Sequence, residues 1–225
     1  EDGEDVLRDV SFCIQPGERI ALVGNNGAGK TTLVKLLCGF YHPTGGEILI
    51  GGHSIETLDL DGYHELLAAI FQDINTIPVS IASNVSGCME EDTDMDRVRE
   101  CLRRAGLWKD IEALEHRELT NMTQTFDPDG IQLSGGMMQK LMLARCLYKD
   151  APLLVLGEPT AALDPIAESE MYEEYKAATS GRSALFISHR LASTKFCDRI
   201  LFLENGRIQE TGTHDELLAK NGKYA

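Results

Sequence analysis

Residues 24–31 are spaced to bind a polyphosphate. They read Gly-Asn-Asn-Gly-Ala-Gly-Lys-Thr and fit the pattern G-x-x-x-x-G-K-[ST] at every fixed position. In such a loop the glycines let backbone N–H groups close around phosphate oxygens, and a helix that follows adds the partial positive charge of its N-terminus. Lys30 is expected to reach the β- and γ-phosphates, and the Thr31 hydroxyl to bind Mg²⁺. The residues that we expect to hold the ligand are Asn25, Asn26, Gly27, Ala28, Gly29, Lys30, Thr31 and Thr32.

A second group of residues that could take part in chemistry extends from Ser134 to Glu158. Ser134, Gly135 and Gly136 stand where a helix over 135–148 is expected to begin, so Ser134 can cap that helix while the glycines leave backbone N–H groups open to an anion. Further along, an apolar strand over 153–156 leads to Glu158, which places a carboxylate at the edge of a sheet where ligands bind. Taken singly, these residues also fit a plain helix cap and a surface charge.

The segments on either side of the first loop have the periodicity that this motif needs. Residues 20–23 are a short apolar run that suits a buried strand, and residues 32–40 carry apolar side chains at helical spacing. A glycine-rich turn that fits the pattern by chance is the alternative, and these flanks argue against it. The sequence therefore predicts a strand, a phosphate loop and a helix in succession, which bind a nucleoside triphosphate.

The rest of the chain alternates between apolar strands and helices, which predicts an α/β domain with a mainly parallel sheet. Asn205-Gly206 is a strong signal for a hairpin between 199–203 and 207–211. The other strands are expected at 20–23, 153–156 and 184–187 in the main sheet and, as antiparallel strands of a smaller layer, at 10–14 and 46–51. Helices are expected near 94–105, 107–114 and 135–148.

The domain organisation follows from where this alternation stops. The pattern becomes helical over 74–149, and no linker there suggests an independently folding part. We therefore expect one domain over 1–225, with an α/β core from 1–73 and 150–225 and a helical sub-domain inserted over 74–149.

Composition narrows the class of protein. The 225 residues are 43% hydrophobic, enough for a full core, and the net charge of −15 argues against a surface that binds nucleic acid. The six cysteines lie far apart without a C-x-x-C pair, so neither a metal site nor a disulfide framework is expected. No apolar stretch reaches the roughly 18 residues that cross a bilayer, and the acidic start is no signal peptide. These features predict that this polypeptide segment is soluble and intracellular.

In their order along the chain, these motifs resemble the nucleotide-binding domain of an ATP-binding cassette (ABC) transporter, from about Val6 to the last residue. The matching elements are the phosphate loop, Gln72, the signature at 133–136, the strand at 153–156, Glu158, Asp164 and His189. The stretches 187–191 and 212–217 are similar to the exporter branch. The resemblance implies a P-loop NTPase (RecA-like) core with an antiparallel β sub-domain and an inserted α-helical sub-domain, and ATP and Mg²⁺ as ligands.

The resemblance also implies a role for each catalytic residue. Glu158 would be the general base that polarises the attacking water, and His189 would contact the γ-phosphate. Gln72 would bind Mg²⁺ together with Thr31 and link the metal to a membrane-facing loop. Phosphoryl transfer mainly needs positioning of the reactants and neutralisation of charge. These residues, together with Lys30, are therefore sufficient to catalyse ATP hydrolysis.

The partners are implied in the same way. Two such domains, identical or different, pair head to tail, so that Ser134, Gly135 and Gly136 contact the γ-phosphate bound by the other copy, and Asp164 communicates between the two sites. The membrane helices of an exporter are expected to be fused upstream of residue 1, which places the domain at the cytoplasmic face of the cell membrane. No nucleic acid is expected.

The chain departs from the family's pattern at three places. Gly157 stands where the family has the aspartate that holds Mg²⁺, so hydrolysis should suffer more than ATP binding, and we predict slow or absent turnover. Met137 replaces a glutamine and cannot make its hydrogen bonds, which weakens contact across the dimer. No aromatic residue that could stack on adenine precedes Phe12.

Three functions therefore remain to be compared. The first is the ATPase motor of an exporter, and the second is a degenerate, binding-only domain whose partner hydrolyses ATP. Gly157 and Met137 favour the second, whereas Glu158 and His189 oppose it. The third is a non-transport ABC protein that acts on DNA or ribosomes, which the acidic charge argues against.

Overall fold

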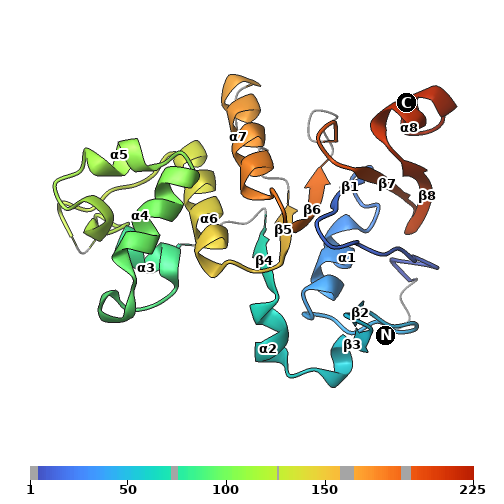
Figure 1. Ribbon diagram of the computed structural model, residues 1–225, viewed down its shortest axis with the longest axis horizontal. Coiled ribbons are helices and arrows are strands. Elements are labelled where there is room, and N and C mark those ends of the chain that lie inside the picture. The colour runs from blue at the N-terminus through green and yellow to red at the C-terminus, as the bar shows by residue number, and fades with distance from the viewer. Residues whose placement is uncertain (1–4, 72–75, 126, 158–164, 189–193) are drawn as a thin grey trace. The chain divides into compact units, whose positions relative to one another are not determined.

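The computed structural model describes residues 5–71, 76–125, 127–157, 165–188 and 194–225, with the backbone alone for 165–168 (Figure 1). The chain divides into two compact units. The first comprises Glu1–Ala69, Pro152–Glu158 and Gly181–Ala225, and the second comprises Ile70–Ala151 and Pro159–Ser180.

A six-stranded sheet organises the first unit. Its strands, in the order in which they lie side by side, are β4 (Leu67–Ile70), β5 (Leu153–Gly157), β6 (Ser183–Ser188), β1 (Arg19–Val23), β7 (Arg199–Glu204) and β8 (Arg207–Gly212). β5, β6, β1 and β7 run parallel, and their central residues are buried, as their continuous apolar runs predict. The expected α/β fold with a mainly parallel sheet is therefore confirmed, as are the three expected strands of the main sheet.

The expected hairpin is also confirmed. β7 and β8 pair antiparallel, and both residues of the turn have positive φ, +49° at Asn205 and +72° at Gly206. These angles are those of the two-residue turn that an Asn-Gly pair favours.

The smaller antiparallel layer is shorter than expected. It consists of β2 (Leu49–Ile50) and β3 (His53–Ser54), and residues 10–14 form no strand. The strand predicted at 10–14 was wrong, because the alternation of apolar and polar residues indicates only which side chains face inward and not whether the backbone pairs with another strand. Val10, Phe12 and Ile14 are indeed half-buried and Ser11 and Cys13 exposed, but no described strand pairs with this backbone.

Short helices complete the first unit. They are α1 (Lys30–Leu37), η1 (Ile55–Thr57), α2 (Leu60–Glu65) and α8 (His214–Lys220). Asp59 caps α2, and a capping box of Thr213 and Glu216 begins α8.

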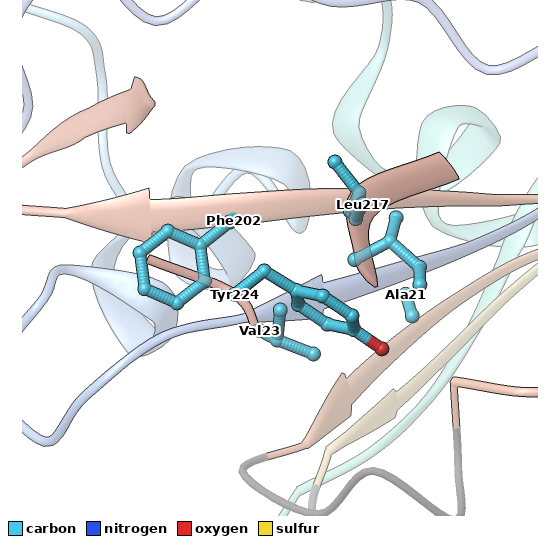
Figure 2. Packing of buried hydrophobic residues seen from close by; sticks show 6 residues of the cluster. Ala21, Val23, Phe202, Leu217 and Tyr224 are labelled. Carbon is cyan, nitrogen blue, oxygen red and sulfur yellow. The ribbon is translucent and has the colours of Figure 1, made fainter. Parts of the chain in front are cut away.

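An apolar cluster lies over β1 and β7, as Figure 2 shows. Its buried members are Ala21, Val23, Ile200, Phe202, Leu217 and Tyr224. The Tyr224 hydroxyl lies 2.8 Å from Thr194 Oγ1 and 2.8 Å from His214 Nδ1, and burial raises the pKa of Tyr224. The ring thus packs in the cluster while its hydroxyl is satisfied by two side chains.

The second unit is helical. It contains α3 (Ile81–Ser86), η2 (Glu90–Asp92), α4 (Met95–Arg104), α5 (Trp108–Glu112), η3 (Arg117–Leu119), α6 (Gly135–Lys149) and α7 (Pro165–Ala178). α3 and α4 pack on α6, where Leu102, Leu141 and Leu143 are fully buried. The three helices expected here are confirmed, and their ends differ from the expected ones by at most two residues. None of the helices in the described ranges has the length and apolarity to cross a membrane.

Candidate functional site

Three neighbouring strands of the first unit end at the same edge of the sheet. β1 pairs with β6 so that Val23 lies opposite Ser188, and β5 pairs with β6 so that Gly157 lies opposite Ile187. All three run parallel, so the loops that follow them leave the sheet together. The phosphate loop follows Val23, whereas Glu158, Asp164, His189 and Gln72 lie outside the described residues.

The phosphate loop has a backbone that only its glycines adopt without strain. Gly27 has φ of +79° and Gly29 of +104°, and α1 begins directly afterwards at Lys30. No side chain caps α1, and its first turn carries no acidic residue, in contrast to α2 and α8. A helix N-terminus without an acidic residue or a side-chain cap suits an anionic ligand.

Lys30 points back over the loop. Its side chain is buried, and Nζ donates hydrogen bonds to the carbonyl oxygens of Gly24, at 2.7 Å, and Asn25, at 3.1 Å. The loop thereby holds a positive charge against its own backbone. Asn25, Asn26 and Thr31 are exposed.

Neighbouring backbone explains the first glycine of the motif. A Cβ at Gly24 would lie 2.1 Å from the Leu203 carbonyl oxygen of β7. At the other end of the loop, the Gly206 N–H donates to the Ala28 carbonyl at 3.2 Å. The sequence assigned Gly206 only to a hairpin, and the parallel pairing of β7 with β1 is what brings it to the loop.

The second unit carries the predicted cap at Ser134. Ser134 Oγ accepts a hydrogen bond from the Met137 N–H at 3.3 Å, and the Ser134 carbonyl accepts one from Met138 at 2.9 Å. The first turn of α6 has no acidic residue, Ser134 and Gly135 are exposed, and a Cβ at Gly135 would meet nothing within 4 Å. The start of α6 is therefore open at Gly135, and N–H groups in the first turn of a helix have no partners within that helix.

An ion pair fixes α6 within its unit. Lys140 Nζ lies 3.0 Å from Glu174 Oε1 of α7 and also donates to the Gly106 carbonyl at 3.3 Å. Burial raises the pKa of Glu174, although the hydrogen bond from Lys140 acts in the opposite direction. The helix that begins with the signature is thus tied to two other segments of the second unit.

Residues that could hold a metal are few in the described ranges. No group of three or more His, Cys, Asp or Glu side chains gathers there. Of the two expected ligands, Thr31 is described, and it offers an exposed hydroxyl oxygen beside the loop. This donor suits a hard cation such as Mg²⁺ that is held mainly by substrate phosphates and water. Gly157, at the end of β5, adds no carboxylate.

Comparisons with known proteins agree with this geometry. Residues 7–161 match the family described as "ABC transporter". The chain is 42% identical over 219 residues to the ATP-dependent lipid A-core flippase of Paraburkholderia xenovorans, covering 97% of this chain and 36% of that protein. It is 41% identical over 226 residues to the protein of that name from Ralstonia nicotianae, covering 100% and 38%.

A solved structure, described as a bacterial Atm1-family ABC exporter with ATP bound, superimposes with a TM-score of 0.87 at 33% identity. That match covers 99% of this chain and 39% of the other. The chain therefore spans a little over a third of the length of the curated relatives it matches.

Proposed function

Because the chain belongs to the ABC transporter family, whose ATPase domain is a P-loop NTPase, we propose that it binds and hydrolyses ATP to power a membrane exporter. The observation that carries the proposal is the phosphate loop. It combines left-handed glycines, an uncapped helix N-terminus and the buried Lys30 ammonium in one concave backbone. This arrangement suits the tail of a nucleoside triphosphate.

The residues of this loop divide the work of binding. Backbone N–H groups and the start of α1 hold the phosphates, Lys30 neutralises charge on the β- and γ-phosphates, and Thr31 holds Mg²⁺. The metal, when bound, neutralises charge that develops on the transferring phosphoryl group. Gly157 contributes no carboxylate to hold that metal, so ATP hydrolysis is slow. ATP binding persists, because the contacts of the phosphate loop do not involve Gly157. Glu158 would act as the general base that polarises the attacking water, His189 would contact the γ-phosphate, and Gln72 would bind Mg²⁺ together with Thr31.

Pairing with a second ATPase domain completes each site. The exposed start of α6 supplies Ser134, Gly135 and Gly136 to the γ-phosphate held by the partner domain, and Asp164 links the two sites. The two compact units then act as the α/β core and the signature-bearing sub-domain of one ATPase domain. ATP closes the pair head to tail, and release of ADP or phosphate reopens it.

The remaining partners are membrane-spanning segments. The relatives are named as flippases and are almost three times as long as this chain. We therefore propose that this chain drives transmembrane domains of an exporter from the cytoplasmic face of the membrane.

A binding-only domain is the second candidate. Gly157 at the end of β5 and Met137 in the first turn of α6 favour it, since both remove a group used in hydrolysis or in cross-dimer contact. Its partner domain would then hydrolyse the ATP.

Two measurements on the same preparation separate these functions. Calorimetry reports ATP binding, and release of inorganic phosphate from Mg-ATP reports turnover. Binding with slow turnover supports the motor function, binding without measurable turnover supports the binding-only domain, and absence of binding contradicts both.

A further inference from the structure

The β7–β8 hairpin continues past the point at which β1 becomes the phosphate loop. β7 runs parallel to β1, and the last paired residues are Val23 and Phe202. Leu203 therefore lies beside Gly24, and the turn at Asn205 and Gly206 lies beside the loop. The β7–β8 register shifts between Phe202 and Leu203, and such bulges re-aim the backbone.

Gly206 lies between two backbone segments. Its N–H donates to the Ala28 carbonyl at 3.2 Å, and its carbonyl accepts from the Arg8 N–H at 2.8 Å. Gly206 is buried and has φ of +72°, and a Cβ there would lie 2.2 Å from the Val6 carbonyl oxygen. An ion pair of 2.7 Å between Arg207 and Asp9 also joins the hairpin to the segment that contains Arg8. No residue with a side chain fits this position without moving the turn.

The hydrogen bond to Ala28 sets the direction of a phosphate-binding group. A peptide bond is planar and trans, so its carbonyl and its N–H point in opposite directions. The Ala28 carbonyl points to Gly206, and the N–H of the same peptide, which belongs to Gly29, therefore points away from the hairpin. Gly29 is the residue at which α1 begins to form, where N–H groups have no partner within the helix.

We propose that Gly206 is a positioning residue for the nucleotide, acting through the phosphate loop. It anchors the Ala28 carbonyl and so aims the Gly29 N–H at the phosphates, while the Leu203 carbonyl limits the loop at Gly24. The inference rests on the proposed function, since it assigns to the hairpin a part in that same site.

The test is a pair of matched alanine substitutions. Gly206→Ala introduces both strain at positive φ and the collision with Val6. Gly181→Ala introduces similar strain, since Gly181 has φ of +75°, but a Cβ there meets nothing within 4 Å and the position is exposed. Both variants should lose some thermal stability. Only Gly206→Ala should bind ATP and ADP about tenfold more weakly, because a charge-assisted hydrogen bond is lost.

Amide hydrogen exchange of the unmodified chain gives a second test that needs no variant to fold. Saturating ATP should slow exchange at the Gly206 N–H together with the loop amides, because this N–H is bonded to the Ala28 carbonyl. Wild-type ATP affinity in a folded Gly206→Ala, or unchanged exchange at Gly206 while loop amides become protected, would overturn the inference alone. An unmodified chain that binds no ATP would overturn the proposed function and the inference together.

Discussion

Removing the Lys30 ammonium tests how the phosphate loop holds its ligand. In Lys30→Met the replacement keeps much of the length and apolar stem of the buried side chain but lacks the three N–H donors. A hydrogen bond from a charged donor contributes about 1.5–3 kcal/mol. At 1.4 kcal/mol per tenfold, the dissociation constant for ATP should rise about 10- to 150-fold.

The same substitution also removes two hydrogen bonds within the protein. The Gly24 carbonyl is buried and loses its 2.7 Å donor, whereas Asn25 is exposed and can turn to water. One unsatisfied buried acceptor costs about 1–3 kcal/mol of folding free energy. For a domain of this size, the midpoint of thermal unfolding should fall by about 2–4 °C per kcal/mol.

Titration calorimetry with ATP, together with thermal unfolding, measures both effects. The matched control is Lys35→Met, which makes the same change on the same helix at a partly exposed position, where Nζ lies 3.5 Å from the Tyr41 hydroxyl. Lys35→Met should bind ATP as the unmodified chain does. Equal ATP affinity in Lys30→Met and Lys35→Met would refute the assignment of Lys30.

Three further changes probe other parts of the site. Gly157→Asp restores a carboxylate at the end of β5 and should raise the rate of Mg-ATP hydrolysis about 10²-fold, with little change in ATP affinity; an unchanged phosphate-release rate would contradict the role given to this position. Ser134→Ala should destabilise the chain by about 1 kcal/mol through loss of the helix cap. Ser134→Asp keeps the cap, so it should lose only the ATP-dependent dimerisation that size-exclusion chromatography detects. Unchanged dimerisation of Ser134→Asp would contradict a contact between the signature and a phosphate. The hydrogen bond from Arg19, 2.9 Å long, lowers the pKa of Asp198, so this pair stabilises the fold above about pH 4 and loses that effect as the pH falls toward the lowered value. Thermal unfolding between pH 7 and pH 3 should therefore show a smaller acid-induced loss in Asp198→Asn, and equal losses in the two proteins would contradict this.

Local signals explain what could be predicted from the sequence. A strand, a glycine loop and a helix in succession are encoded by residues 20–40 alone, and the structure has them in that order, with the helix at Lys30–Leu37 where 32–40 was expected. The Asn205-Gly206 hairpin was equally predictable, since positive φ at two adjacent positions selects these residue types. The cap at Ser134 likewise depends on its own next three residues.

Features that depend on distant pairing could not be read in this way. Residues 10–14 alternate like a strand, but a strand exists only where a partner backbone is within hydrogen-bonding reach. The contact of Gly206 with Ala28 arises from the parallel register of β1 and β7, whose paired residues lie about 180 positions apart in the chain. Its one sequence signal was a turn that follows a buried strand.

The most direct test of the whole account is calorimetric titration of the folded, unmodified chain with ATP, alongside adenosine as a ligand that lacks the phosphates. A backbone loop with a buried ammonium predicts saturable heat with ATP in the millimolar range or below, and none with adenosine. Absence of heat with ATP, or equal binding of adenosine, would contradict the claim that this loop holds a triphosphate.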